Sequence, residues 1–139
     1  YFTGSKVRKV CMNAMGNDPK ENTDNASILL KYENGSNVVI NYFSNGSKAY
    51  SKEKIEIFSL ERTLILDNWR KLHGYGFKNF SKMTTSQDKG HFNQFKKLLE
   101  NERNNGNPII PFDEIINTTQ STFAAIQSLK EGKWVNINL

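Results

Sequence analysis

The spacing of apolar residues changes once along the sequence, close to Gly90. Before this point, apolar and polar residues alternate in short runs that turn-forming residues separate, as in residues 54–60. After it, apolar residues recur every three or four positions, as at Phe92 and Phe95. A series of strands followed by helices predicts an α+β fold, in which helices cover one face of an antiparallel sheet.

Turn signals divide the first part of the chain into about six strands. Asn34-Gly35 is the strongest hairpin signal, because both residues tolerate positive φ, and Asn45-Gly46 repeats it. We predict a mostly antiparallel, open sheet whose strands cover residues 6–15, 26–32, 37–44, 54–60, 63–68 and 77–83. Residues 69–72 either continue the fifth strand or pair with the sixth.

Two helices are predicted after this sheet, both on one of its faces. The first starts at Gly90, with Thr85 and Asp88 as a capping box, and stops at residues 104–108. The second opens at Pro111 and ends at Gly132, and residues 134–137 form a closing strand. Its apolar stripe consists of Ile115, Ile116, Thr119, Phe123, Ile126 and Leu129.

Composition and charge exclude several classes of protein. A chain of 139 residues with 37% hydrophobic and 24% charged residues is typical of one globular domain. The net charge is +5, but the basic residues are spread over the chain with acidic residues among them, which favours a mildly basic surface over a nucleic-acid-binding face. No apolar run is long enough to span a membrane, so we expect no membrane partner.

The few cysteine and histidine residues limit metal and redox chemistry. Cys11 is the only cysteine, so an internal disulfide is impossible and a reducing, cytoplasmic location is predicted. Together with Cys11, His73 and His91 are too few and too scattered for a zinc site, and we predict no metal.

Residues 73–80, His-Gly-Tyr-Gly-Phe-Lys-Asn-Phe, are similar to the octamer of RNA-recognition motifs. In this alternative, Tyr75, Phe77 and Phe80 would stack on unpaired bases of a single-stranded RNA. Lys78 stands where that pattern has a buried valine, and no helix is predicted between the second and third strands. An exposed hairpin whose aromatic residues pack on a helix or line a pocket is the competing interpretation, and we do not expect nucleic acid as a partner.

Residues 86–91 bring an acid, a base and a histidine to the start of a helix. Lys89 and His91 are therefore candidates for binding a polar substrate, while Asp88 would cap the helix if the segment is only structural. We predict no catalytic residue in the chain. We also predict no cofactor-binding residue, because Gly74-x-Gly76 has Asn79 where a dinucleotide-binding loop needs a third glycine.

The first four residues, Tyr-Phe-Thr-Gly, are typical of the last turn of a helix with a left-handed glycine at its end. We expect the chain to be a piece of a longer protein.

The order of several segments resembles the C-terminal domain of Gfo/Idh/MocA-type oxidoreductases, the family of glucose–fructose oxidoreductase and inositol dehydrogenase. It is most similar to the branch that is often fused to an alcohol-dehydrogenase-like domain. The segments are Asn-Ala-Ser-Ile-Leu-Leu-Lys-Tyr-Glu-Asn-Gly-Ser at 25–36, Lys-Ile-Glu-Ile-Phe at 54–58, Gln-Asp-Lys-Gly-His at 87–91, Pro-Phe-Asp-Glu-Ile-Ile at 111–116 and Thr-Phe-Ala-Ala-Ile-Gln-Ser-Leu at 122–129, followed by Gly132.

This resemblance implies that residues 1–139 are a single C-terminal domain that encloses a small sugar-like substrate and pairs subunits through an open sheet face. The family binds NAD or NADP in an N-terminal Rossmann domain, which also carries the Glu-Lys-Pro motif and is absent from this chain. The resemblance thus implies a fragment of an NAD(P)-dependent sugar or polyol dehydrogenase of carbohydrate metabolism. It would act with its own Rossmann domain, in a homo-oligomer, and would be inactive alone.

Overall fold

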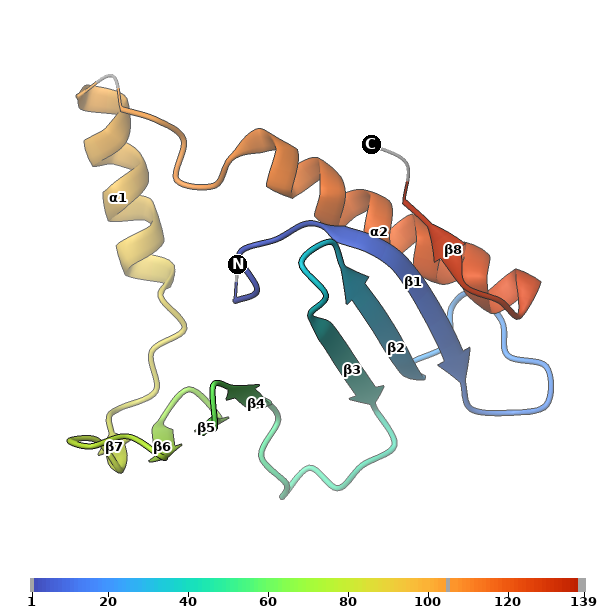
Figure 1. Cartoon of the computed structure of the whole chain (residues 1–139), viewed down its shortest axis with the longest axis horizontal. Helices are drawn as coiled ribbons and strands as arrows, with labels where there is room; N and C mark the ends of the chain where they lie inside the picture. The colour runs from blue at the N-terminus through green and yellow to red at the C-terminus, as the bar shows by residue number, and fades with distance from the viewer. Residues whose placement is uncertain (1, 105, 138–139) are drawn as a thin grey trace. The chain divides into compact units, whose positions relative to one another are not determined.

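The computed structural model describes residues 2–104 and 106–137, which fall into two compact units (Figure 1). The first unit combines Tyr1–Asn45 with Pro108–Leu139, and the second is Gly46–Asn107. Tyr1, part of the predicted helix end, lies outside the described residues. Gly4 has the expected positive φ of 59°.

The first unit is a four-stranded antiparallel sheet with one long helix. Its strands lie in the order β3-β2-β1-β8, so the last strand of the chain returns to pair with the first. Figure 1 shows α2 running along β1 and β8. The elements are β1 (Val7–Ala14), β2 (Asn25–Tyr32), β3 (Asn37–Phe43), α2 (Phe112–Glu131) and β8 (Val135–Asn136).

The second unit is a separate antiparallel sheet, followed by a helix. Its strands lie in sequence order, β4-β5-β6-β7, as a meander does. Register pairs Ile55 with Leu66, Leu66 with Leu72 and Leu72 with Met83, so these residues form one apolar row across all four strands. The elements are β4 (Lys54–Ser59), β5 (Arg62–Asp67), β6 (Lys71–Tyr75), β7 (Lys82–Thr84) and α1 (His91–Arg103).

The predicted α+β class and the antiparallel pairing are confirmed, but the described residues form eight strands, which divide into two sheets rather than forming one. The two helices also do not share one sheet. α2 covers the first sheet, whereas α1 belongs to the second unit and buries none of its described residues. Among the described residues, neither helix has the length and hydropathy that crossing a bilayer requires.

The helix α2 faces its sheet with small and polar side chains. Because successive helical residues are 100° apart, its buried residues share one side of the helix: Asn117, Ser121, Ala124, Ala125 and Ser128. They cover a core that contains Val7, Val10 and Leu30.

Most of the apolar stripe identified in the sequence lies on the opposite side of α2. Ile115 is 45% exposed and Phe123 is 70% exposed, while Ile126 and Leu129 are half-buried. Much of the apolar side of α2 is therefore not covered by the first unit. Small side chains on the buried side allow the helix to approach β1 closely, which large apolar side chains would prevent.

Candidate functional site

The segment that carries the predicted substrate-binding residues lies between β7 and α1, in the second unit. Lys89 Nζ lies 2.8 Å from Glu53 Oε1, just before β4, and both side chains are about one-third exposed. The other carboxylate oxygen, Oε2, is buried without a hydrogen-bond partner among the described residues. Lys89 is therefore anchored, and its charge is already compensated by Glu53.

Gln87 and Asp88 fix the same segment through backbone groups. Gln87 Nε2 donates to the main-chain and side-chain oxygens of Asn68, at 3.2 and 3.1 Å, in the turn between β5 and β6. Asp88 Oδ1 accepts a hydrogen bond of 2.7 Å from the Gly90 N–H. These contacts hold the backbone that leads into α1.

The predicted capping box is wrong. The residue at the N-cap is Gly90, with φ of 78°, and no side chain caps the helix there. Thr85 Oγ1 donates instead to the Ser86 carbonyl. A left-handed glycine at this position changes the chain direction, so the helix begins one residue later, at His91.

His91 is the more accessible of the two predicted substrate-binding residues. It is the first residue of α1 and is exposed. Lys89 and His91 thus lie at the same helix start, one held by an acid and one free to meet a ligand. A polar ligand there would meet the imidazole and the backbone N–H groups of the first helical turn.

Residues 73–80 do not form a flat stacking platform. A Cβ placed on Gly74 would lie 2.5 Å from the Phe80 ring and 3.1 Å from Phe77, so both rings pack against this glycine. The two rings also meet edge to face at 6.1 Å, with the Arg62 guanidinium 5.4 Å from the centre of Phe77. Tyr75 alone is widely exposed, at 57%. No helix separates β2 from β3, so the structure gives no support to the RNA-binding alternative.

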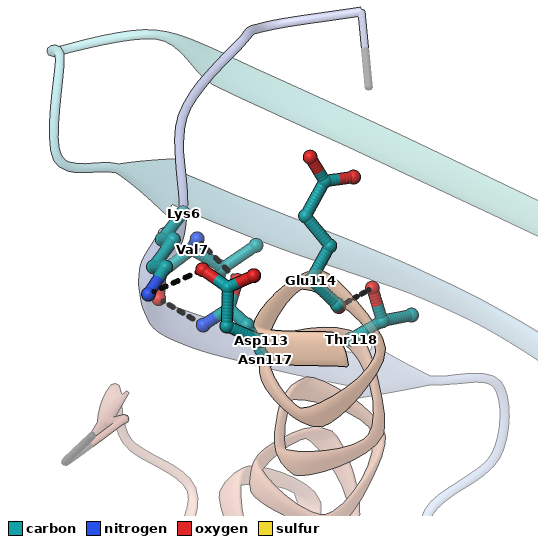
Figure 2. Close-up of polar contacts among 6 residues, drawn as sticks. All are labelled: Lys6, Val7, Asp113, Glu114, Asn117 and Thr118. Atoms are coloured by element: carbon teal, nitrogen blue, oxygen red, sulfur yellow. Dashed lines mark hydrogen bonds and ion pairs between the residues drawn. The ribbon is translucent and has the colours of Figure 1, made fainter. Parts of the chain in front are cut away.

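A second polar cluster joins α2 to β1 in the first unit (Figure 2). Asn117 Oδ1 accepts from the Val7 N–H at 2.8 Å, and its Nδ2 donates to the Val7 carbonyl at 3.0 Å. The pairing of β1 with β2 shifts register between Val7 and Lys9, so the Asn117 amide takes the place of a strand neighbour.

The Ser128 side chain also bonds a main-chain group of β1, further along the strand. Its Oγ accepts from the Met12 N–H at 3.0 Å and donates to the Lys133 carbonyl at 2.6 Å. β8 is only two residues long and pairs with Lys9 and Val10, so it does not reach Met12. The sequence analysis missed these residues, although polar or small residues at 117, 121, 124 and 128 recur at the spacing of one helix face.

An ion pair at the start of α2 extends this cluster. Lys6 Nζ lies 3.0 Å from Asp113 Oδ2, which stands in the first helical turn (Figure 2). The hydrogen bond and the positive charge of Lys6 lower the pKa of the Asp113 carboxyl. At the other end of the helix, Lys130 Nζ lies 2.6 Å from Glu21 Oε1.

The start of α2 does not suit a dinucleotide, because its first turn carries Asp113 and Glu114, whose negative charges repel a pyrophosphate. Before α1, Asp88 occupies the Gly90 N–H. In the described part of the chain, no three Asp, Glu, His or Cys side chains gather as metal ligands.

Several solved structures have a fold similar to that of this chain. The chain matches an oxidoreductase from Agrobacterium radiobacter in complex with NAD+, L-tartaric acid and magnesium, with a TM-score of 0.74 and 17% identity over 94% of this chain and 43% of that one. It matches a probable dehydrogenase from Thermotoga maritima with a TM-score of 0.73 and 19% identity over 98% and 44%. The WlbA dehydrogenase from Bordetella pertussis, in complex with NADH and UDP-GlcNAcA, gives 0.58 and 14% over 96% and 40%.

The chain therefore spans less than half the length of the structures that it matches. These neighbours are an oxidoreductase and two dehydrogenases, and the likeness confirms the fold that the sequence resemblance implied. No protein-family model matches the sequence, and no curated protein matches it either.

Proposed function

We propose that this chain is the substrate-enclosing and subunit-pairing part of an NAD- or NADP-dependent oxidoreductase that acts on a sugar or polyol. One observation carries the proposal: 94–99% of the chain superposes on only 40–44% of each of five oxidoreductases. We expect the segment to be inactive alone, because it corresponds to less than half of such an enzyme. NAD or NADP would be held by the N-terminal Rossmann domain of the longer protein.

The exposed apolar side of α2 supports the proposal that a neighbouring domain packs against this helix. Phe112, Ile115, Ile116 and Phe123 expose between 37% and 72% of their surface, and all four lie away from the sheet. Contiguous apolar surface of this kind marks a site that another protein surface covers. Its own Rossmann domain is the partner that we assign to it.

The sheet face of the first unit that points away from α2 suits a homo-oligomer. Cys11, Leu29 and Val39 are direct cross-strand partners and form one apolar row. The neighbouring rows are polar, with Lys9, Lys31 and Asn37 on one side and Asn13, Ser27 and Asn41 on the other. An apolar centre with a polar border is the usual composition of a subunit interface.

We assign the substrate contacts of this chain to Lys89 and His91. The exposed imidazole of His91 can donate to and accept from sugar hydroxyl groups. Lys89, which the Glu53 carboxylate holds in place, offers its remaining N–H donors.

Two measurements test the function. A titration of the 139-residue chain with NADH, followed by nicotinamide fluorescence, should show no change, and tight binding would overturn the proposal. The coding sequence that precedes Tyr1 should encode a Rossmann domain. A different kind of domain in that place would also rule the proposal out.

A further inference from the structure

We propose that Asn45 is a site of spontaneous deamidation, at which the folded chain converts an asparagine into aspartate and isoaspartate. The sequence contains three Asn-Gly pairs, at 34–35, 45–46 and 105–106. Asn105 lies outside the described residues, so the structure compares the first two. They have the same sequence, Asn-Gly-Ser, but different environments, and this contrast carries the inference.

The reaction needs only water and the chain itself. The Gly46 nitrogen loses its proton and attacks Cγ of Asn45, so a new N–C bond closes a five-membered succinimide. The bond from Cγ to Nδ2 breaks, and ammonia leaves with the proton. Water then adds to one of the two ring carbonyls, which opens the ring to aspartate or to isoaspartate. Glycine favours the step because no Cβ shields the attacking nitrogen.

At Asn34, hydrogen bonds hold each group that takes part in this reaction. The side-chain Nδ2 donates to the Thr3 carbonyl at 2.9 Å, and Oδ1 accepts from the Ser36 N–H at 3.1 Å. The attacking group is also occupied, because the Gly35 N–H donates to the Tyr32 carbonyl at 3.1 Å. Three hydrogen bonds must break before Gly35 can reach the Asn34 side chain.

At Asn45, the corresponding side-chain amide and glycine N–H are not held by strong hydrogen bonds among the described residues. The Asn45 Nδ2 reaches only the Met15 sulfur, at 3.7 Å, and a thioether is a weak acceptor. Among the described residues, the Gly46 N–H has no hydrogen-bond acceptor. Both residues are exposed, so water reaches the ring that the reaction forms. Asn45 therefore reacts from the native state, whereas Asn34 reacts only after local opening.

The product would alter the end of β3. The Asn45 N–H donates to Asn25 Oδ1 at 3.2 Å, and Asn25 Nδ2 donates to Asp24 Oδ1 at 2.7 Å. A carboxylate at position 45 places a second negative charge near Asp24. Isoaspartate adds a methylene to the main chain between Asn45 and Gly46, where the first unit ends and the second begins.

The test is incubation of the chain at mildly alkaline pH in heavy-oxygen water, followed by chymotryptic peptide mapping. Cleavage after Tyr42 or Phe43 separates the two sites, and heavy oxygen marks carboxylates that formed during incubation. We expect deamidation at Asn34 to be at least about tenfold slower than at Asn45, because its hydrogen bonds must open first. In concentrated urea, where neither site is protected, the two rates should agree within about twofold.

Gly46→Ala provides the control for chemistry. The added Cβ shields the attacking nitrogen and should slow the reaction at Asn45 without changing Asn34. Equal rates at both sites in the folded chain would overturn the proposal. A folded chain unmodified at Asn45, under conditions in which the urea-unfolded chain reacts, would also overturn it.

Discussion

The Asn117 side chain satisfies both main-chain polar groups of Val7, although the two residues are 110 positions apart. Asn117 is 5% exposed and Val7 is 7% exposed, so water cannot replace the amide. This pair of hydrogen bonds fixes the N-terminal half of α2 on β1, where the strand shifts register.

Asn117→Ala should therefore lower the free energy of unfolding by about 3 kcal/mol, because it leaves a buried donor and a buried acceptor without partners. Urea unfolding, followed by circular dichroism, measures the loss. Thr118→Ala is the matched control on the same helical turn: its exposed hydroxyl bonds only the Glu114 carbonyl, and the change should stay within about 0.5 kcal/mol. Equal effects of the two substitutions would contradict the prediction.

The two buried serines of α2 should respond differently to alanine. Ser128→Ala removes the partners of the Met12 N–H and the Lys133 carbonyl and should cost about 2 kcal/mol. Ser121 Oγ donates only to the Asn117 carbonyl, one turn earlier in the same helix, so Ser121→Ala should cost less than about 1 kcal/mol. Thermal unfolding of both variants checks the order, and the reverse order would refute the assignment.

The pair formed by Lys6 and Asp113 predicts a dependence of stability on acid pH. The pKa of the Asp113 carboxyl is lower in the folded chain than its usual value. Asp113 therefore stabilises the fold above its unfolded pKa, and this stability is lost as pH falls through the folded pKa. Asp113→Asn should thus lower the melting temperature at neutral pH, and the difference should disappear in strong acid. Glu114→Gln removes a charge from the same helical turn without an ion pair, and its smaller effect isolates the contribution of Lys6.

Gly74 tests the packing of the aromatic segment. A methyl group at this position would meet the Phe80 ring at 2.5 Å, so Gly74→Ala should lower the free energy of unfolding by about 1–3 kcal/mol. The double variant Gly74→Ala with Phe80→Leu should recover part of this loss, because the smaller side chain gives the methyl group room. Tyr75→Ala, next in sequence but exposed, should have little effect. Additive losses in the double variant would show that the ring does not limit the space at Gly74.

Local structure could be predicted from the sequence because its signals are local. The Asn34-Gly35 hairpin and the end of α2 at Gly132 follow from residues that tolerate positive φ, and both glycines have it, at 88° and 62°. The separation into two sheets could not be predicted in this way. Alternation shows that residues 37–43 and 54–59 are strands, but it does not show that β3 and β4 belong to different sheets.

The buried side of α2 and the anchoring of Lys89 depend on distant parts of the chain. The apolar stripe that includes Phe123 is the stronger sequence signal. The small, polar side of α2 nevertheless packs on β1, because it supplies hydrogen-bond partners for β1 main-chain groups. Lys89 has the spacing of a ligand-binding residue, but its partner Glu53 lies 36 positions away and could not be identified from the spacing.

The same contact gives the last prediction, which separates an anchoring role from substrate binding. Lys89 and Glu53 are one-third exposed, so their coupling in a double-mutant cycle with Lys89→Met and Glu53→Gln should be about 0.5 kcal/mol. His91→Ala, paired with Glu53→Gln in a second cycle, should show no coupling, because His91 does not contact that carboxylate. Amide exchange should also become faster around Gly90 in Lys89→Met and stay unchanged in His91→Ala. If His91 couples to Glu53 as strongly as Lys89 does, the carboxylate is not a specific anchor for the lysine, and the two residues then share one charge network at the start of α1.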